Sequence, residues 1–188
     1  MNYVDKIKDY LEQELEAIKS LDLEMVSQVM NVLENARLNG RRIYICGNGG
    51  SGSTASHFCC DFNKVCDNKD EKYSIECLND NVPTILAVSN DYGYDEVFAR
   101  QAEAHVRPGD LFIGISTSGN SENVFRAVNV AKEKGAITAA FLGKDGGRIK
   151  GIVDYPVVVE CDTTARVQES HICIIHIICE LVEKAMAK

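Results

Sequence analysis

Apolar side chains recur at helical spacing near the start of the chain. Over residues 3–19 they return every three or four positions, which predicts an amphipathic helix with one apolar face. The positions on this face are Val4, Ile7, Leu11, Leu15 and Ile18. Asp22 can cap a second helix that runs to about Leu38, where the Asn-Gly pair at 39–40 ends it. We therefore expect residues 1–40 to form a helical hairpin that packs in an oligomer.

From residue 41 onward, short apolar runs alternate with amphipathic segments. The runs predicted as strands are "RRIYIC" (41–46), "YSIECL" (73–78), "LFIGIS" (111–116), "ITAAFLG" (137–143) and "YPVVVE" (155–160). The segments predicted as helices are 52–64, 83–89, 95–106, 121–134 and a long one from Thr164 to the C-terminus. Near-continuous apolar strands that alternate with helices favour a parallel sheet covered on both faces. We expect one α/β domain over residues 1–188, of doubly wound type, between the hairpin and the long helix.

The composition narrows the classes of function. The 188 residues are 45% hydrophobic and 26% charged, which is typical of soluble globular proteins. A formal net charge of −8 disfavours a general nucleic-acid binder, which would carry a basic face. Because no apolar run approaches a membrane span and the N-terminus lacks a signal-peptide pattern, we expect a cytoplasmic protein. The eight cysteines form no C-x-x-C pair, so we expect buried, reduced thiols.

A glycine-rich turn, "GNGGSG" at 47–52, separates the first predicted strand from the next helix. Its glycines fit the dinucleotide pattern G-x-G-x-x-G, but Glu76 comes late for the acidic residue that this pattern requires. It also approaches a Walker loop, with Ser53 where the lysine should stand. A ligand-free tight turn is a further alternative. His57 and Asp61 follow at i and i+4, so they share one helix face and can be a structural pair or two metal ligands.

A second polar turn lies between the strand at 111–116 and the helix at 121–134. It carries hydroxyl and amide side chains at Ser116, Thr117, Ser118, Asn120 and Ser121. Hydroxyls and free backbone N–H groups at a helix N-terminus can bind an anion without any arginine, which suits an acidic protein. Ordinary capping of the helix by Ser118 or Ser121 is the alternative.

Several motifs of the chain occur together in one known family. "STSGNSENV" at 116–124 resembles the phosphate-binding loop of SIS (sugar isomerase) domains. "GNGGS" followed by "HF", "SND" at 89–91, "GKDGG" at 143–147 and "ARVQESH" at 165–171 are similar to the phosphoheptose isomerases within that family. These enzymes convert sedoheptulose 7-phosphate to a mannoheptose 7-phosphate. The resemblance implies a flavodoxin-like parallel sheet, a homotetramer and zinc, with one ion per subunit.

The resemblance also implies roles for particular residues. The metal positions of the family correspond to His57, Asp61, Gln168 and His176. Its substrate contacts correspond to Asn48, Gly49, Gly50, Asp61, Asn90, Asp91, Ser116, Thr117, Ser118, Ser121 and Gln168. For an isomerisation through an enediol, we assign Asp61 as the base at carbon and His176 as the acid–base partner at the oxygens. His171 is interpreted as structural, and no function is assigned to His105.

Helix geometry constrains this set, because eight residues rise about 12 Å along a helix. Gln168 and His176 can then hardly bind one ion. Either the last helix begins after Gln168, or the two residues serve sites completed by different chains; we favour the second. The chain also departs from the family at Asp61, where a glutamate is typical, and at Lys64, near which the family tends to carry an arginine.

Two other functions stay open at this point. One is a non-catalytic SIS protein that binds the replication initiator, although such proteins lose the acidic and second histidine positions that this chain keeps. The other is an SIS isomerase or sensor for another sugar phosphate, since the same phosphate loop would serve it.

Overall fold

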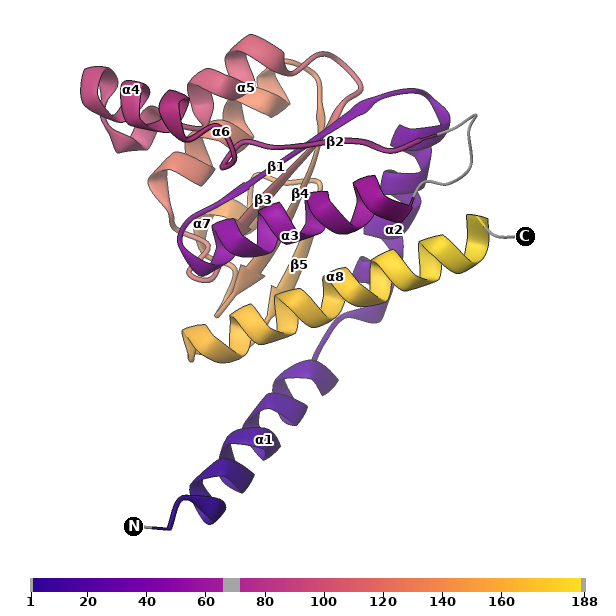
Figure 1. Ribbon diagram of the computed structural model, residues 1–188, viewed down its shortest axis with the longest axis vertical. Helices are drawn as coiled ribbons and strands as arrows, with labels where there is room; N and C mark the ends of the chain where they lie inside the picture. The colour runs from indigo at the N-terminus through magenta and orange to yellow at the C-terminus, as the bar shows by residue number, and fades with distance from the viewer. Residues whose placement is uncertain (1, 66–71, 187–188) are drawn as a thin grey trace.

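The computed structural model describes residues 2–65 and 72–186. Its centre is a parallel sheet in the order β2-β1-β3-β4-β5 (Figure 1). The strands are β1 (Arg42–Gly47), β2 (Ser74–Cys77), β3 (Leu111–Ser116), β4 (Ile137–Gly143) and β5 (Tyr155–Val159). This order is that of flavodoxin-like doubly wound folds. The predicted fold class and each of the predicted strands are therefore confirmed.

Helices cover both faces of the sheet, as the apolar strands require. They are α1 (Val4–Lys19), α2 (Leu23–Leu38), α3 (Gly50–Val65), α4 (Val82–Tyr92), α5 (Ala99–His105), α6 (Glu122–Glu133), α7 (Gly147–Lys150) and α8 (Thr164–Met186). Asp22 caps α2, as predicted, by accepting a hydrogen bond from the Met25 N–H. The helix predicted over 95–106 is broken: a 3₁₀ turn at Tyr94–Glu96 precedes a shorter α5.

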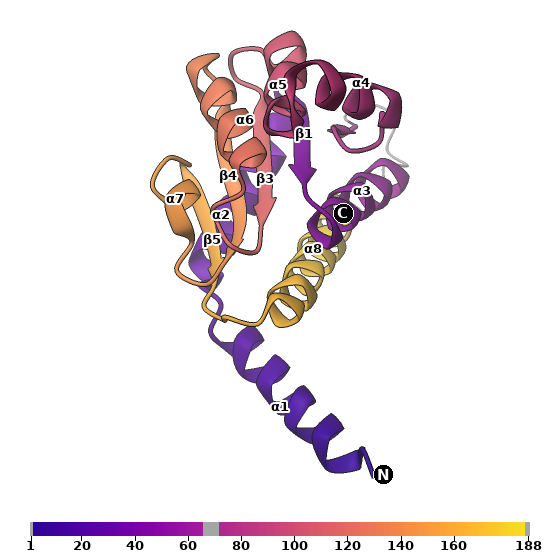
Figure 2. The same ribbon diagram turned by 90° about the vertical axis from the view of Figure 1, so that its left-hand side faces the viewer.

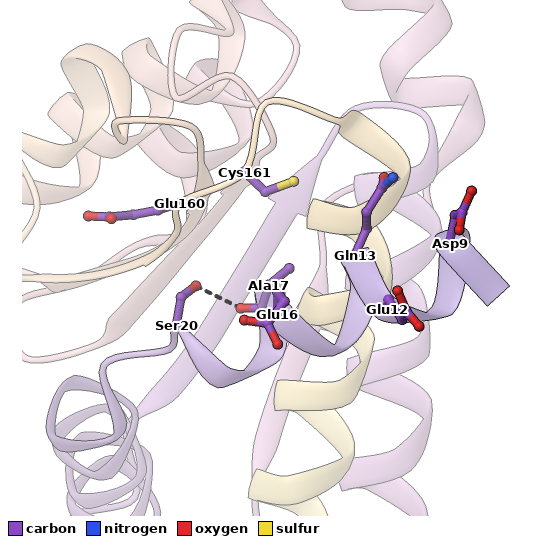
Figure 3. Close-up of a pocket in the computed structure, with 8 residues that line it drawn as sticks. All are labelled: Asp9, Glu12, Gln13, Glu16, Ala17, Ser20, Glu160 and Cys161. Atoms are coloured by element: carbon purple, nitrogen blue, oxygen red, sulfur yellow. Dashed lines mark hydrogen bonds between the residues drawn. The ribbon is translucent and has the colours of Figure 1, made fainter. Parts of the chain in front are cut away.

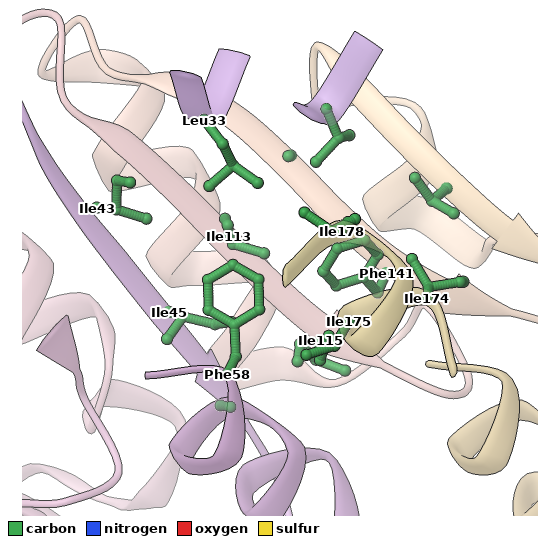
Figure 4. Packing of buried hydrophobic residues seen from close by; sticks show 14 of the residues in the cluster. Leu33, Ile43, Ile45, Phe58, Ile113, Ile115, Phe141, Ile174, Ile175 and Ile178 are labelled. Atoms are coloured by element: carbon green, nitrogen blue, oxygen red, sulfur yellow. The ribbon is translucent and has the colours of Figure 1, made fainter. Parts of the chain in front are cut away.

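One face of the sheet packs against α2, α3 and α8. Isoleucines of β1 and β3 and Phe141 of β4 point into this layer, where they meet Phe58 of α3 (Figure 4). From α8, the apolar side chains Ile174, Ile175 and Ile178 are fully buried in the same cluster. Burying each such side chain stabilises the fold by about 1.5–3 kcal/mol. The rotation and height of α3 and α8 on the sheet are therefore fixed by apolar packing.

The first helix departs from the predicted hairpin. Instead of folding back along α2, α1 extends away from the sheet (Figures 1 and 2). It contacts the start of α8, where the Tyr10 hydroxyl donates to Glu169 and the Arg166 guanidinium lies 3.0 Å from the centroid of the Tyr10 ring. Burial and the neighbouring Glu169 raise the pKa of Glu14, in the same junction, to about 7.

The predicted apolar stripe of α1 faces outward in the single chain. Val4, Ile7, Leu11 and Leu15 are between 51% and 60% exposed, and Ile18 alone packs against the core. Exposed apolar side chains in a row are typical of a surface that another chain covers. The apolar stripe is present as predicted, but the described residues of this chain leave those four positions largely exposed.

Four of the seven described cysteines are buried as predicted, whereas Cys161 and Cys173 are half-buried. Cys46, Cys59 and Cys77 are buried thiols, and burial raises the pKa of Cys77 to about 11. Cys60 is exposed, and Cys66 lies outside the described residues. Among the described helices, none combines the length and the apolar character needed to cross a bilayer.

Candidate functional site

The two polar turns lie side by side at the carboxyl edge of the sheet. β1 and β3 are neighbours, with Gly47 paired to Ile115, so the glycine turn after β1 adjoins the serine loop (Ser116–Ser121) after β3. The chain leaves β1 for α3 on one face and leaves β3 for α6 on the other (Figure 2). Ligands of doubly wound sheets bind at such a switch point, beyond the carboxyl ends of the strands.

Close contacts within the protein explain why the first turn requires glycine. The Gly47 N–H donates to Asn79 Oδ1 at 3.1 Å, and Asn79 Nδ2 donates back to the Gly47 carbonyl at 2.7 Å. A Cβ atom at Gly50 would lie only 2.5 Å from Gln168 Nε2. These close approaches support a tight, protein-packed turn, and they place Gln168 directly against it. The glycine pattern alone therefore gives no reason to invoke a dinucleotide.

The serine loop gathers its hydroxyls at the start of α6. Ser116 Oγ lies 2.9 Å from Ser121 Oγ, while Ser118 Oγ accepts a hydrogen bond from the Asn120 N–H. Ser121 occupies the N-cap position, yet its side chain makes no capping hydrogen bond. The alternative in which the Ser121 hydroxyl caps α6 is therefore wrong. The positive end of the α6 dipole and the hydroxyls of this loop are groups that can together bind an anion.

Three chemically active side chains converge where α3 and α8 run side by side. His57 Nε2 lies 2.9 Å from His176 Nε2 and 3.2 Å from Asp61 Oδ2. His176 Nε2 and Asp61 Oδ2 are 3.9 Å apart. The side chains of His57 and His176 are about half exposed, and that of Asp61 is 25% exposed, so solvent and ligands can reach all three. We call these residues the histidine–aspartate trio.

The geometry of the trio fits a divalent metal ion. Zinc binds nitrogen and oxygen ligands at about 2.0–2.2 Å in tetrahedral sites, which separates ligand atoms by roughly 3.4 Å. The separations within the trio, 2.9, 3.2 and 3.9 Å, bracket that value. Two imidazole nitrogens and one carboxylate oxygen form a donor set that suits zinc. Asp61, although shorter than the glutamate typical of the family, still reaches both imidazoles.

Gln168 does not lie next to the trio in this chain. It lies against Gly50 at the start of α3, two helical turns before His176 on α8. Because α8 begins at Thr164, the alternative in which the helix starts after Gln168 is wrong. Asp61 and His176 meet within one chain, so no second chain is needed to bring this pair together.

The remaining predicted residues lie near the same edge. Asn90 and Asp91 are exposed near the C-terminal end of α4, and Asn90 Nδ2 donates to Asp91 Oδ1 at 2.8 Å. Asn48 is tied by hydrogen bonds to Tyr94 and Asn123. The sequence analysis did not identify Asn79, Tyr94 or Asn123 as residues of this edge. Of the three, only Asn123 could have been found from the sequence, because it lies two residues after Ser121 of the serine loop.

A separate hollow of about 540 Å³ lies between α1 and the segment at 160–161 (Figure 3). Its lining includes the carboxylates of Asp9, Glu12, Glu16 and Glu160, and none of the predicted site residues. An acidic wall repels a phosphorylated ligand. This hollow is therefore a poor candidate for the site of an anionic substrate.

Comparison with known proteins identifies the class. The family model of the SIS domain matches residues 2–143. The chain is 41% identical to the phosphoheptose isomerase of Geotalea daltonii, over 97% of both chains. It is 38% identical to the probable phosphoheptose isomerase of Thermoplasma acidophilum, over 94% of this chain and 97% of that one. The structure of the Neisseria gonorrhoeae phosphoheptose isomerase superposes with a TM-score of 0.89 at 32% identity, covering 97% of this chain and 100% of that one.

These similarities define first the class of the protein and then its family. The domain match and the fold are those of an SIS-domain protein. Within that class, the chain belongs to the phosphoheptose isomerase family. The resemblance that the motifs indicated is thereby confirmed.

His171, on α8, is a histidine with a structural environment. Its side chain is buried, its Nε2 lies 3.1 Å from the Leu142 carbonyl as a hydrogen-bond donor, and burial lowers its pKa to about 4. This supports its interpretation as a structural residue.

The burial of His171 predicts a particular pH dependence of stability. In the unfolded chain its pKa is near the ordinary value of 6.5, so the unfolded state gains a proton first as the pH falls. Stability present above pH 6.5 should be lost as the pH falls towards 4, by up to roughly 3 kcal/mol. Urea unfolding between pH 7 and 4.5 should show a smaller loss for His171→Gln. The exposed His105→Gln serves as control, and an unchanged slope in His171→Gln would contradict the assignment.

Proposed function

We propose that this protein is a phosphoheptose isomerase that interconverts sedoheptulose 7-phosphate and D-glycero-D-manno-heptose 7-phosphate. The observation that carries the proposal is the trio His57, Asp61 and His176, which lies on helices that begin at the same sheet edge as the serine loop. The names of the relatives support the same reaction. They do not favour the initiator-binding alternative.

The serine loop binds the phosphate, and this orients the sugar. Hydroxyls of Ser116, Thr117, Ser118 and Ser121 and N–H groups at the start of α6 donate hydrogen bonds to the phosphate oxygens. His57 stands seven residues beyond Gly50, or about 10 Å along α3. An extended sugar phosphate held by the loop would therefore direct its carbonyl end along α3, towards the trio, with Gly49, Gly50 and Gln168 beside it.

Asp61 is the base in this scheme. Its Oδ2 faces both imidazoles, which leaves Oδ1 to take the proton from the carbon next to the carbonyl. The same carboxyl group returns the proton to the neighbouring carbon, so that ketose and aldose interconvert through an enediol. His176 exchanges a proton with the sugar oxygens. One nitrogen cannot hold a metal ion and a proton at the same time. His176 can therefore exchange this proton through Nε2 only while Nε2 is not a metal ligand.

The trio would hold one zinc ion per subunit. When bound, zinc polarises a carbonyl and stabilises negative charge that develops on its oxygen. We assign Gln168 to the sugar rather than to the ion, since it lies two helical turns away in this chain.

Replacement of the base tests the reaction directly. Asp61→Asn keeps the shape of the side chain but cannot accept the proton, so kcat should fall by about 10²–10⁴-fold with little change in KM. Conversion of sedoheptulose 7-phosphate is followed by separating the two heptose phosphates. Asp80→Asn, an exposed carboxylate bonded to Ser56 of α3, is the matched control and should keep its activity.

The same assay separates the alternatives. Turnover of a different phosphorylated ketose, with none on the heptose, would favour another SIS isomerase. Failure to turn over any member of a ketose phosphate panel would contradict an isomerase altogether.

Metal content can be predicted as well. The purified wild-type protein should contain about one zinc ion per chain, measured by inductively coupled plasma mass spectrometry. His57→Ala should weaken zinc binding by about 100-fold or more in competition with a chromophoric chelator, because it removes one of three protein ligands. His105→Ala should bind zinc like the wild type. Equal zinc affinity in His57→Ala and the wild type would exclude the trio as the site.

We further propose a homotetramer with sites shared between subunits, in which the apolar stripe of α1 packs against other copies. Exposed apolar side chains on α8, Ile177 and Leu181, could extend the same interface. Tyr10 and Glu14 of α1 are hydrogen-bonded to Glu169 and Ser170, the two residues that follow Gln168 on α8, so assembly would also order this end of the site.

A charge on the stripe should therefore dissociate the assembly. Leu11→Glu places a carboxylate at a position that is 60% exposed in the single chain and buried in the proposed tetramer. Sedimentation velocity should show smaller species, and activity should fall in parallel. Leu38→Glu, at a 53% exposed leucine on α2, is the matched control. A Leu11→Glu protein that sediments as the wild type would overturn the assigned interface.

A further inference from the structure

Three segments that carry proposed substrate contacts meet in one hydrogen-bonded cluster. Asn48 belongs to the glycine turn, Tyr94 follows the Asn90–Asp91 pair, and Asn123 lies in the first turn of α6, just after the serine loop. The Tyr94 hydroxyl donates to Asn48 Oδ1 at 2.7 Å. We call Asn48, Tyr94 and Asn123 the asparagine cluster.

The two asparagines form a reciprocal amide pair. Asn48 Nδ2 donates to Asn123 Oδ1 at 2.8 Å, and Asn123 Nδ2 donates to Asn48 Oδ1 at 2.9 Å. Asn123 is only 2% exposed, so its amide depends on partners within the protein. Rotating either amide by half a turn would bring oxygen against oxygen and nitrogen against nitrogen. The pair therefore fixes both the spacing and the orientation of the two side chains.

The cluster leaves little of the Asn48 side chain for a ligand. A carbonyl oxygen has two lone pairs, and Asn48 Oδ1 already accepts hydrogen bonds from Tyr94 and Asn123. One of its two Nδ2 hydrogens is used as well. Any sugar contact at Asn48 is thus made by its remaining amide hydrogen or by the backbone of the turn. The side chain chiefly ties the turn to its neighbours.

This tie connects helices on opposite faces of the sheet (Figure 2). On one side, the Asn48 carbonyl accepts a hydrogen bond from the Ser51 N–H in the first turn of α3, the helix that carries His57 and Asp61. On the other side, Asn123 belongs to α6, whose start carries the serine loop. The cluster therefore links the turn that starts α3 to the helix that follows the serine loop, by side-chain hydrogen bonds between Asn123 and Asn48 and a backbone hydrogen bond from Ser51 to Asn48.

We propose that Asn123 and Tyr94 are positioning residues, which act through Asn48 to set the placement of the trio relative to the serine loop. The inference rests on the proposed function, because it assumes that one substrate spans both ends. Each end would bind its own group without the tie. Only the simultaneous fit of phosphate and carbonyl would be lost, and small misplacements of this kind can cost up to about 100-fold in rate.

A double-mutant cycle tests the coupling. Asn123→Ala should lower kcat/KM for sedoheptulose 7-phosphate by about 10–100-fold, while the dissociation constants for inorganic phosphate and for zinc stay within about twofold. In an Asn48→Ala background, Asn123→Ala should have little further effect, because the residue through which it acts is gone. Additive effects in the double variant would overturn the proposal, as would a parallel loss of phosphate affinity.

Two further variants guard against a simple folding defect. Asn129→Ala removes a partly buried asparagine on the same helix, whose amide donates to the Phe125 carbonyl at 3.1 Å, and should leave activity unchanged. Tyr94→Phe removes one hydroxyl at a half-exposed position, so it should fold normally. It should lower kcat/KM by a few-fold in the wild type and have no effect in Asn48→Ala. An unchanged kcat/KM in Tyr94→Phe would remove Tyr94 from the proposal.

Hydrogen–deuterium exchange tests the tie without any substrate. Asn123→Ala should speed exchange of backbone amides at 48–53, whereas Asn129→Ala should not. Unchanged exchange in Asn123→Ala would contradict the tie even in an active enzyme. Faster exchange together with an inactive wild type would instead confirm the tie and reject the proposed isomerase function.

Discussion

The site depends above all on the apolar packing of α3 and α8 against one face of the sheet. Phe58 on α3 and Ile174, Ile175 and Ile178 on α8 are fully buried there. The buried side chains fix the rotation of both helices. As a result, His57, Asp61 and His176 lie where α3 and α8 face each other and remain accessible to solvent. The convergence of the trio is therefore a consequence of hydrophobic packing, and it needs no attraction among the three polar groups themselves.

The second constraint is the topology of the sheet. Strand order β2-β1-β3 sends the chain to opposite faces after β1 and after β3, and this opens the edge where the glycine turn and the serine loop meet. An acidic protein can bind a phosphate at such an edge with neutral groups, namely hydroxyls and helix N–H groups. The asparagine cluster connects the two halves of this edge, so that one substrate can contact the serine loop and the trio at the same time.

Much of this could be predicted from the sequence, because the signals were local or belonged to a family. Strand positions followed from apolar runs, and the shared helix face of His57 and Asp61 followed from their spacing. Contacts between distant segments could not be predicted by periodicity. The meeting of His57 with His176, and of Asn48 with Asn123, depends on how helices are set on the sheet. The hairpin prediction failed at α1, because the apolar stripe shows which face of the helix is buried in an assembly but not the angle at which α1 leaves α2.

The central claim is that the serine loop and the trio act on the two ends of one sugar phosphate. A crystal structure of the Asp61→Asn variant with sedoheptulose 7-phosphate tests it most directly. The account predicts the phosphate on the hydroxyls of Ser116–Ser121, with the carbonyl end of the same molecule beside residue 61 and His176. A phosphate bound elsewhere, or a carbonyl end that points into a cavity separate from the trio after all neighbouring subunits are generated, would contradict it.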